Sequence, residues 1–299
     1  MASSGWDLVR PEDYPGLFQA ADQASTDGQK SYLRALRLQL SLAVLAAASA
    51  AFTVRIGDSR TDIAAVITAL AFVCALAVDV AVLQRAPGKS WYEGRALAES
   101  VKTLSWRYAI AAQPFPRTMP DDEADKVFVD RVSLIQRDLP AVAIQPTTAP
   151  AITDRMRRLR HAPLNERREA YLHNRITDQQ FWYATKAQYH RRRAGRLQAL
   201  VLMFEVVGVA GALAKAFGVV DFDLAGIIAA TVAALAAWST ARQHSSTATA
   251  YVIASHELSV IGELLRNQQD EQRWATAAGD AEEAISREHT LWRASHAGI

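Results

Sequence analysis

Leu197 to Phe217 reads LQALVLMFEVVGVAGALAKAF, an apolar run that decides the fold of this chain. Arg191, Arg192, Arg193 and Arg196 precede it, and the chain is apolar again from Phe222 to Trp238, with Arg242 beyond. At about 1.5 Å per helical residue, each run is close to the length that crosses the roughly 30 Å hydrocarbon core of a bilayer. Gly218 to Asp221, between the runs, leaves room only for a turn. The sequence therefore predicts a helical hairpin through a membrane.

A second pair of apolar runs lies earlier in the chain. Leu38 to Val54 and Ile63 to Leu83 are separated by the polar segment Arg55 to Asp62. Alanine contributes little to membrane insertion, so the alanine-rich first run also fits a buried helix of a large soluble bundle. Two hairpin patterns in one chain are hard to place in a single soluble core. We therefore predict an all-α membrane protein with two transmembrane hairpins and long cytoplasmic helical extensions. The four predicted spans are residues 38–56, 63–83, 197–217 and 222–241.

The overall composition conceals this segregation, because 21% of the residues are charged and the net charge is only +2. That charge does not favour nucleic-acid binding, and no base-reading or phosphate-binding motif is present. Cys74 is the only cysteine, which excludes a disulfide within the chain. The scattered histidines lack carboxylate or cysteine partners at metal-binding spacing. We expect no cofactor, no metal site and no catalytic residues.

Prolines and helix-start patterns divide the rest of the chain. Residues 1–30 contain prolines and glycines and are predicted to form a loop segment, with a short helix as the alternative. A first module is expected at 31–139, a Pro-rich linker at 140–152 and a second module at 153–299. Capping boxes at Ser90 to Glu93 and Thr177 to Gln180 predict two helix starts. Asp280 to Glu283 suggests a last short helix.

Two predicted helices outside the spans carry apolar residues at alternating spacings of three and four, as in a coiled coil. We expect these seams to join subunits of a homo-oligomer. The first seam comprises Leu97, Val101, Leu104 and Tyr108, and the second comprises Tyr251, Ala254, Leu258, Ile261 and Leu265.

Basic residues flank the open ends of both hairpins, whereas the two turns carry few. By the positive-inside rule, both termini and the central region are expected in the cytoplasm.

Ionisable residues inside the spans are candidates for lining a pore. Glu205 lies eight residues after Leu197, about 12 Å deep in a straight helix, where a charged group facing lipid is costly. The alternative for Glu205 is a protonated carboxyl hydrogen-bonded between helices. Asp79 and Lys215 lie nearer span ends, where side chains can reach the membrane surface.

Small residues recur every four positions in the third and fourth spans, and such faces let helices approach closely in lipid. They are Gly208 and Ala212 in the third span and Gly226, Ala230 and Ala234 in the fourth. The pattern is compatible with packing inside one hairpin and with packing between subunits.

Two stretches carry a family resemblance. WYEGRALAESVKTLSWRY (Trp91 to Tyr108) and YLHNRITDQQFWYATKAQYHRRRA (Tyr171 to Ala194) resemble the bacterial SLATT family. These are membrane modules with paired transmembrane helices, found beside nucleotide-signalling and nucleotide-sensing defence genes. The resemblance implies two fused modules and an effector that permeabilises the host membrane as an oligomeric pore or ion channel. It implies a cytosolic nucleotide-sensing protein or a cyclic nucleotide signal as partner. The alternative is a non-conducting, membrane-anchored scaffold that recruits a cytosolic sensor or toxin.

Overall fold

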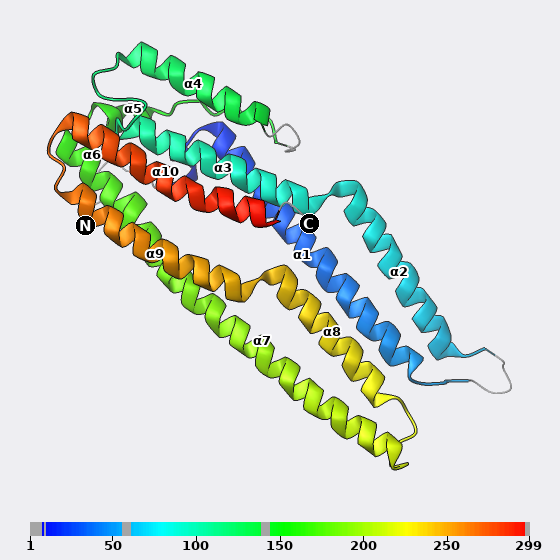
Figure 1. Cartoon of the computed structure of the whole chain (residues 1–299). Helices are drawn as coiled ribbons and strands as arrows, with labels where there is room; N and C mark the ends of the chain where they lie inside the picture. Colours follow the sequence, from blue (N-terminus) through cyan, green and yellow to red (C-terminus); the bar gives the residue numbers. More distant parts are fainter. Residues whose placement is uncertain (1–7, 9, 56–60, 139–143, 297–299) are drawn as a thin grey trace. The chain divides into compact units, whose positions relative to one another are not determined.

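The computed structural model describes residues 8, 10–55, 61–138 and 144–296, and this part of the chain is helical without a strand. A 3-10 helix at Pro11–Asp13 comes first, and a π-helix at Leu172–Thr177 lies between α6 and α7. The α-helices are α1 (Gly16–Ala50), α2 (Ile63–Arg85), α3 (Pro87–Ala109), α4 (Asp121–Asp138), α5 (Asp154–His161), α6 (Leu164–Tyr171), α7 (Asp178–Ala216), α8 (Leu224–Arg242), α9 (His244–Arg266) and α10 (Glu271–His296), as Figure 1 shows. The all-α prediction is confirmed.

The chain folds into two compact units, each assembled from segments far apart in the sequence. The bundle unit consists of Met1–Gln29, Pro87–Lys186 and Ala250–Ile299. The hairpin unit consists of Lys30–Ala86 and Ala187–Thr249. These units cut across the predicted modules, because each module supplies a hairpin to one unit and further helices to the other.

The hairpin unit contains two antiparallel helix pairs, α1 with α2 and α7 with α8 (Figure 1). Asp62 begins α2, and its carboxylate accepts hydrogen bonds from the backbone N–H groups of Ala64 and Val54, each at 3.0 Å. These bonds tie the end of the first helix to the start of the second. In the other turn, Gly218 has a φ of 70°, a left-handed conformation that glycine adopts without steric cost.

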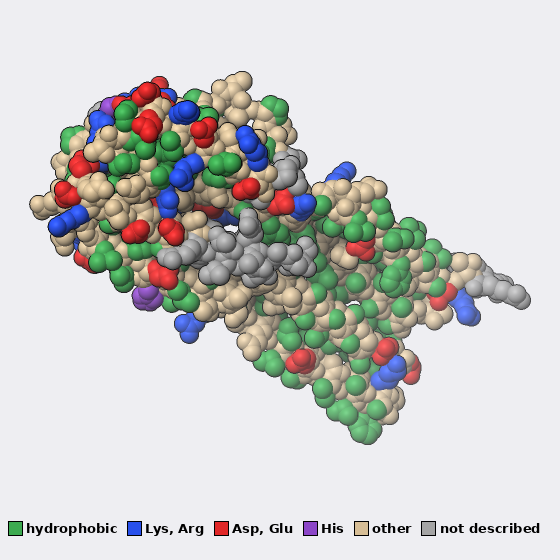
Figure 2. All heavy atoms as spheres, turned by 45° about the horizontal axis from the view of Figure 1, so that its top comes forward, with side chains coloured by type: hydrophobic (Ala, Val, Ile, Leu, Met, Phe, Trp, Pro, Cys, Tyr) green, Lys and Arg blue, Asp and Glu red, His purple; other side chains and the backbone are tan. Residues whose placement is uncertain are grey.

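Side chains in the hairpin unit leave large apolar areas uncovered. Among the described residues, four helices are long and apolar enough to cross a membrane, and at most 11% of each apolar window is buried within the protein. Phe72, Leu83 and Val206 are 63%, 79% and 70% exposed, and hydrophobic side chains dominate the surface of this unit in Figure 2. A soluble protein rarely exposes such contiguous apolar surface, whereas hydrocarbon would cover it favourably. This exposure favours a membrane span over a buried helix of a soluble bundle for the first apolar run.

The bundle unit has its core around α3. Leu97, Val101 and Trp106 of this helix are completely buried. The Trp106 ring meets Tyr171 edge-on at a centroid distance of 5.6 Å, and Tyr171 in turn meets Trp274 of α10 at 6.0 Å. These aromatic contacts join helices that are widely separated in the sequence, so α3 and α10 pack together as part of one core.

The predicted N-terminal loop is wrong for residues 16–30, which belong to α1. The glycines and prolines predicted a loop in this segment, but Gly28 lies in α1 and allows that helix to pack closely against α3. A Cβ on Gly28 would lie only 2.7 Å from the backbone nitrogen of Trp91 in α3. Gly94 of α3 likewise faces the backbone of α1 at Ser25. Two glycines thus let α1 and α3 approach closely, which a loop prediction from composition does not anticipate.

Both capping-box predictions are also wrong. Ser90 lies inside α3, which begins at Pro87 directly after left-handed Ala86, and proline at the first helical position needs no hydrogen-bond partner for its nitrogen. Thr177 ends the π-helix, and the following Asp178 already has helical backbone angles, so no helix begins afresh there. The last helix, α10, begins nine residues before Asp280 and is longer than expected.

The predicted linker at 140–152 is outside the described residues up to position 143. From Ile144 to Ile152 it is not helical and packs on the bundle unit. The backbone N–H of Gly16 donates to the Pro150 carbonyl at 3.2 Å.

Candidate functional site

The polar residues of the hairpin unit fall into two groups, paired and unpaired. Asp79 is paired, because the amide of Gln39 in α1 donates to its carboxylate at 2.8 Å. Ser49 and Thr68 share a second hydrogen bond, also 2.8 Å, between the same two helices. Asp79 therefore contributes to the packing of the first hairpin, where neighbouring side chains satisfy the polar atoms that lipid would leave unsatisfied.

Lys215 lies at the turn of the second hairpin. Its ammonium group is 3.3 Å from the carboxylate of Asp223, and both side chains are about half exposed. The pair spans the residues that connect α7 with α8. An exposed ion pair of this kind contributes little stability. It lies at the turn end of the second hairpin.

Glu205 differs from both. Its side chain is exposed on α7, and within the described part of the chain it forms no hydrogen bond or ion pair. Leu202 and Val209, three and four residues away on the same face, are 56% and 63% exposed. Gln198 and Ala212 continue this exposed face in both directions. The carboxylate therefore points away from the helices of its own hairpin.

The small residues of the second hairpin are only partly used for its packing. A Cβ on Gly208 would lie 3.0 Å from Ile228 of α8, and one on Gly211 would lie 3.0 Å from Leu224. Gly208 is therefore a packing residue as predicted, with Gly211 beside it. Ala212 is exposed and does not share that contact, while Ala230 and Ala234 are half-buried. Gly226 faces the Asp223 carboxylate of its own helix start.

The two hairpins contact one another at both ends. Phe52 and Phe222 stack near the turns with ring centroids 5.2 Å apart. Near the open ends, the guanidinium of Arg37 in α1 lies over the indole of Trp238 in α8 at 5.0 Å. His190 and His244 also meet at the open end of the second hairpin, with their Nδ1 atoms 2.9 Å apart. Sequence reasoning missed these contacts, because residues of different runs show no shared periodicity.

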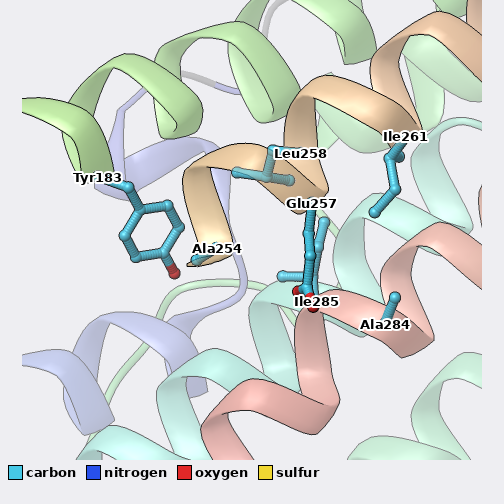
Figure 3. Close-up of a pocket in the computed structure, with 7 residues that line it drawn as sticks. All are labelled: Tyr183, Ala254, Glu257, Leu258, Ile261, Ala284 and Ile285. Atoms are coloured by element: carbon cyan, nitrogen blue, oxygen red, sulfur yellow. The ribbon is translucent and has the colours of Figure 1, made fainter. Parts of the chain in front are cut away.

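The predicted oligomerisation seams lie inside the bundle unit. Leu97, Val101, Leu104 and Tyr108 are buried, as are Ala254, Leu258 and Leu265, while Tyr251 and Ile261 are partly buried against the same core. Figure 3 shows Ala254, Leu258 and Ile261 of α9 beside Tyr183 of α7 and Ile285 of α10, around a small pocket. The seams therefore join helices of one chain.

A buried ion pair lies at the centre of the bundle unit and was missed from the sequence. The Arg175 guanidinium donates to both carboxylate oxygens of Glu282 at 2.9 Å, and both side chains are almost fully buried. The Tyr171 hydroxyl donates to the same carboxylate at 2.8 Å. Burial opposes the Arg175 charge, but Glu282 outweighs it and raises the pKa of Arg175 above its ordinary value. Burial, reinforced by Glu282, likewise raises the pKa of Tyr171, which stays a neutral donor.

Two more buried arginines satisfy the carbonyl groups where α3 ends. Arg160 donates to the Phe115 carbonyl at 2.8 Å, and Arg167 donates to the Ile110 carbonyl at 2.8 Å. The Ile110 carbonyl also accepts from the indole N–H of Trp274 at 2.9 Å, so these donors together satisfy carbonyl groups that lie in the core. The signal for buried arginine was the spacing of Arg167, Tyr171 and Arg175, four residues apart on one helical face.

No group of three or more His, Cys, Asp or Glu side chains among the described residues is placed to hold a metal ion. The candidate functional groups in this part of the chain are the ionisable residues of the hairpin unit and the buried ion pairs of the bundle unit.

Comparison with protein families gives two matches in tandem. Residues 15–168 match the model described as SMODS and SLOG-associating 2TM effector domain 3, and residues 171–292 match SMODS and SLOG-associating 2TM effector domain 1. Comparison with curated proteins and with solved structures gives no match. The first match ends within α6, beyond the Pro-rich segment that was predicted to divide the modules. Each match contains one of the two hairpins described above. The chain therefore belongs to the SLATT family, as a multi-pass membrane protein in which two 2TM effector domains are fused.

Proposed function

We propose that this protein is an oligomeric membrane effector that forms a pore or ion channel in a nucleotide-signalled bacterial defence response. The family descriptions support an effector with paired membrane helices. A cytosolic nucleotide-sensing protein or a cyclic nucleotide would supply the trigger, and conduction through the bacterial inner membrane would be the output. No enzymatic step is part of this proposal.

The exposure of Glu205 is the observation that carries the proposal. A carboxylate at this depth costs several kcal/mol when it faces hydrocarbon. Its own chain offers no hydrogen-bonding or charged partner among the described residues. Water in a pore, or polar groups of neighbouring subunits, would remove that cost. The face of α7 that carries Gln198, Glu205 and Ala212 is therefore assigned to the interior of an assembly, with other faces toward lipid.

Charge removal at Glu205 tests this assignment. Glu205→Gln keeps the shape and the hydrogen-bonding capacity, so we expect normal insertion and assembly with altered ion preference or conductance. The measurement is ion flux and reversal potential for the purified protein in liposomes. Asp79→Asn is the matched control, because Asp79 is already hydrogen-bonded to Gln39 within the chain. Wild-type flux and selectivity in Glu205→Gln would remove this residue from the pore.

The cytoplasmic placement of both termini is a second part of the proposal. It is motivated by basic residues at the open ends of both hairpins, such as Arg34, Arg85 and Arg196. In a Cys74→Ala background, we expect Val219→Cys in the second turn, where the side chain is 74% exposed, to react with an impermeant maleimide on intact cells. Thr148→Cys should react only after lysis. Labelling of position 148 on intact cells would overturn this topology.

A scaffold that recruits a cytosolic partner is the second candidate function. It is favoured by the exposed apolar residues Val252, Ile253, Val260 and Leu264 on α9 of the bundle unit, which are 47–64% exposed. A scaffold needs no ion pathway, so the liposome measurement separates the two candidates. Protein that is inserted and assembled but carries no current at any voltage, with and without the trigger, would favour the scaffold.

A further inference from the structure

Two arginines from different hairpins meet at one tryptophan in the hairpin unit. The Arg37 guanidinium of α1 lies 5.0 Å from the centroid of the Trp238 ring, and that of Arg242, at the end of α8, lies 5.8 Å from it. Cation–π contacts hold a guanidinium by its plane and leave its N–H groups at the edge available. The indole therefore brings together two sets of hydrogen-bond donors that come from separate segments.

Neither guanidinium is neutralised by the described part of the chain. Within it, no carboxylate lies within ion-pair distance of Arg37 or Arg242, and neither side chain forms a hydrogen bond. Arg37 is exposed and Arg242 is half-buried. Most buried arginines of the bundle unit, by contrast, bind carbonyl groups or carboxylates. The donors at Trp238 are thus free for a ligand.

The position along the spans limits what that ligand is. Arg37 directly precedes the apolar run that starts at Leu38, and Arg242 is the last residue of α8. Both lie where the helices leave the hydrocarbon, the level at which tryptophan side chains and lipid headgroups are found. A phosphate group matches the planar donor edge of a guanidinium and is the abundant anion at this depth.

The surroundings favour a lipid with net negative charge. Arg34, Arg193 and Arg196 lie at the open ends of the same hairpins, and all three are exposed. A choline or ethanolamine ammonium group would meet these positive charges, and the Asp79 carboxylate of the first hairpin already accepts a hydrogen bond from Gln39. Phosphatidylglycerol and similar lipids carry no such cation.

We propose that Arg37, Trp238 and Arg242 form a binding site for the phosphate group of an anionic phospholipid, in the leaflet at the open ends of the hairpins. The bound lipid bridges α1 of the first hairpin and α8 of the second. This site does not depend on whether the protein conducts ions.

Native mass spectrometry of the full-length protein in detergent measures the binding directly. Short-chain phosphatidylglycerol is titrated against the wild type and against an Arg37→Gln, Arg242→Gln double variant. At roughly fivefold per arginine, the loss of both charges is expected to weaken binding of the first lipid about 30-fold. An Arg37→Lys, Arg242→Lys variant keeps the charge but not the planar donors, and an intermediate loss is expected. Circular dichroism of each variant checks that the helices are intact.

Arg191→Gln with Arg192→Gln is the matched control, because it removes the same charge from exposed arginines that have no aromatic contact. This control is expected to retain the first lipid. Equal loss in both double variants would mean diffuse attraction and would overturn the site. Equal wild-type affinity for phosphatidylcholine would overturn the selectivity for anionic lipid. Displacement of the lipid by equimolar glycerol phosphate would identify a soluble phosphate ligand and would overturn the assignment to lipid.

Discussion

Glu282→Ala is expected to lower the free energy of unfolding of the bundle unit by about 3–5 kcal/mol, because it leaves the Arg175 charge buried without its partner. Both side chains are almost fully buried, so solvent cannot compensate. The readout is hydrogen exchange of the full-length protein in detergent, followed at the slowest amides of α3 and α10. Their exchange should accelerate by a factor of about 100 or more, since roughly 1.4 kcal/mol corresponds to tenfold.

A triple variant separates the buried charge from the shape of the site. Arg175→Met, Tyr171→Phe and Glu282→Leu together remove the ion pair and the hydroxyl that donates to it. Apolar replacements of a complete buried pair are often neutral or stabilising, so we expect the slow exchange to return for most amides. If Glu282→Ala exchanged as slowly as the wild type, Arg175 would have found another anion or water, and the pair would not support the fold.

Leu258→Glu is expected to destabilise the bundle unit by at least about 3 kcal/mol. Leu258 is 3% exposed, so the substitution removes its apolar packing and buries a carboxylate without a partner. The measurement is the thermal unfolding midpoint of the purified protein by circular dichroism, with crosslinking of the same sample to follow assembly. We expect loss of structure in the bundle unit before any specific loss of oligomers.

Val260→Glu is the control for this substitution. Val260 lies two residues further along α9 and is 62% exposed, so the same change there should alter stability by no more than about 0.5 kcal/mol. A similar midpoint in both variants would contradict the assignment of the second seam to the core of one chain. Loss of oligomers in Val260→Glu with an unchanged midpoint would instead place the subunit contact on the exposed face of α9.

The membrane helices could be predicted from sequence because their signal is local. A continuous apolar run such as Leu197 to Phe217 is specified by insertion into hydrocarbon, which depends on the run itself more than on its neighbours. Helix boundaries were less predictable. Ser90 and Thr177 have the residue pattern of helix starts, but the backbone on the N-terminal side of each determines whether a helix begins there, and that backbone is set by tertiary packing.

The environment of each candidate site residue depends on contacts between segments that are distant in the sequence, and these could not be predicted. Asp79 and Glu205 look alike in sequence, as single carboxylates in apolar runs, yet Gln39 pairs with one and the described chain leaves the other unpartnered. Periodicity correctly identified Leu258 and Leu265 as residues that pack against other helices. It could not tell whether those helices belong to the same chain, because the seam of a bundle and the seam of an oligomer have the same spacing.

The packing of α10 against α3 has a consequence for stoichiometry. α3 lies in the first matched domain and α10 in the second, and the backbone N–H of Gln113 donates to the Ala275 carbonyl across this contact at 2.8 Å. Either domain produced alone would expose the core that the other covers. The fusion therefore fixes the ratio of the two hairpins at one to one. Any closed ring assembled from this chain contains an even number of hairpins, half of each kind.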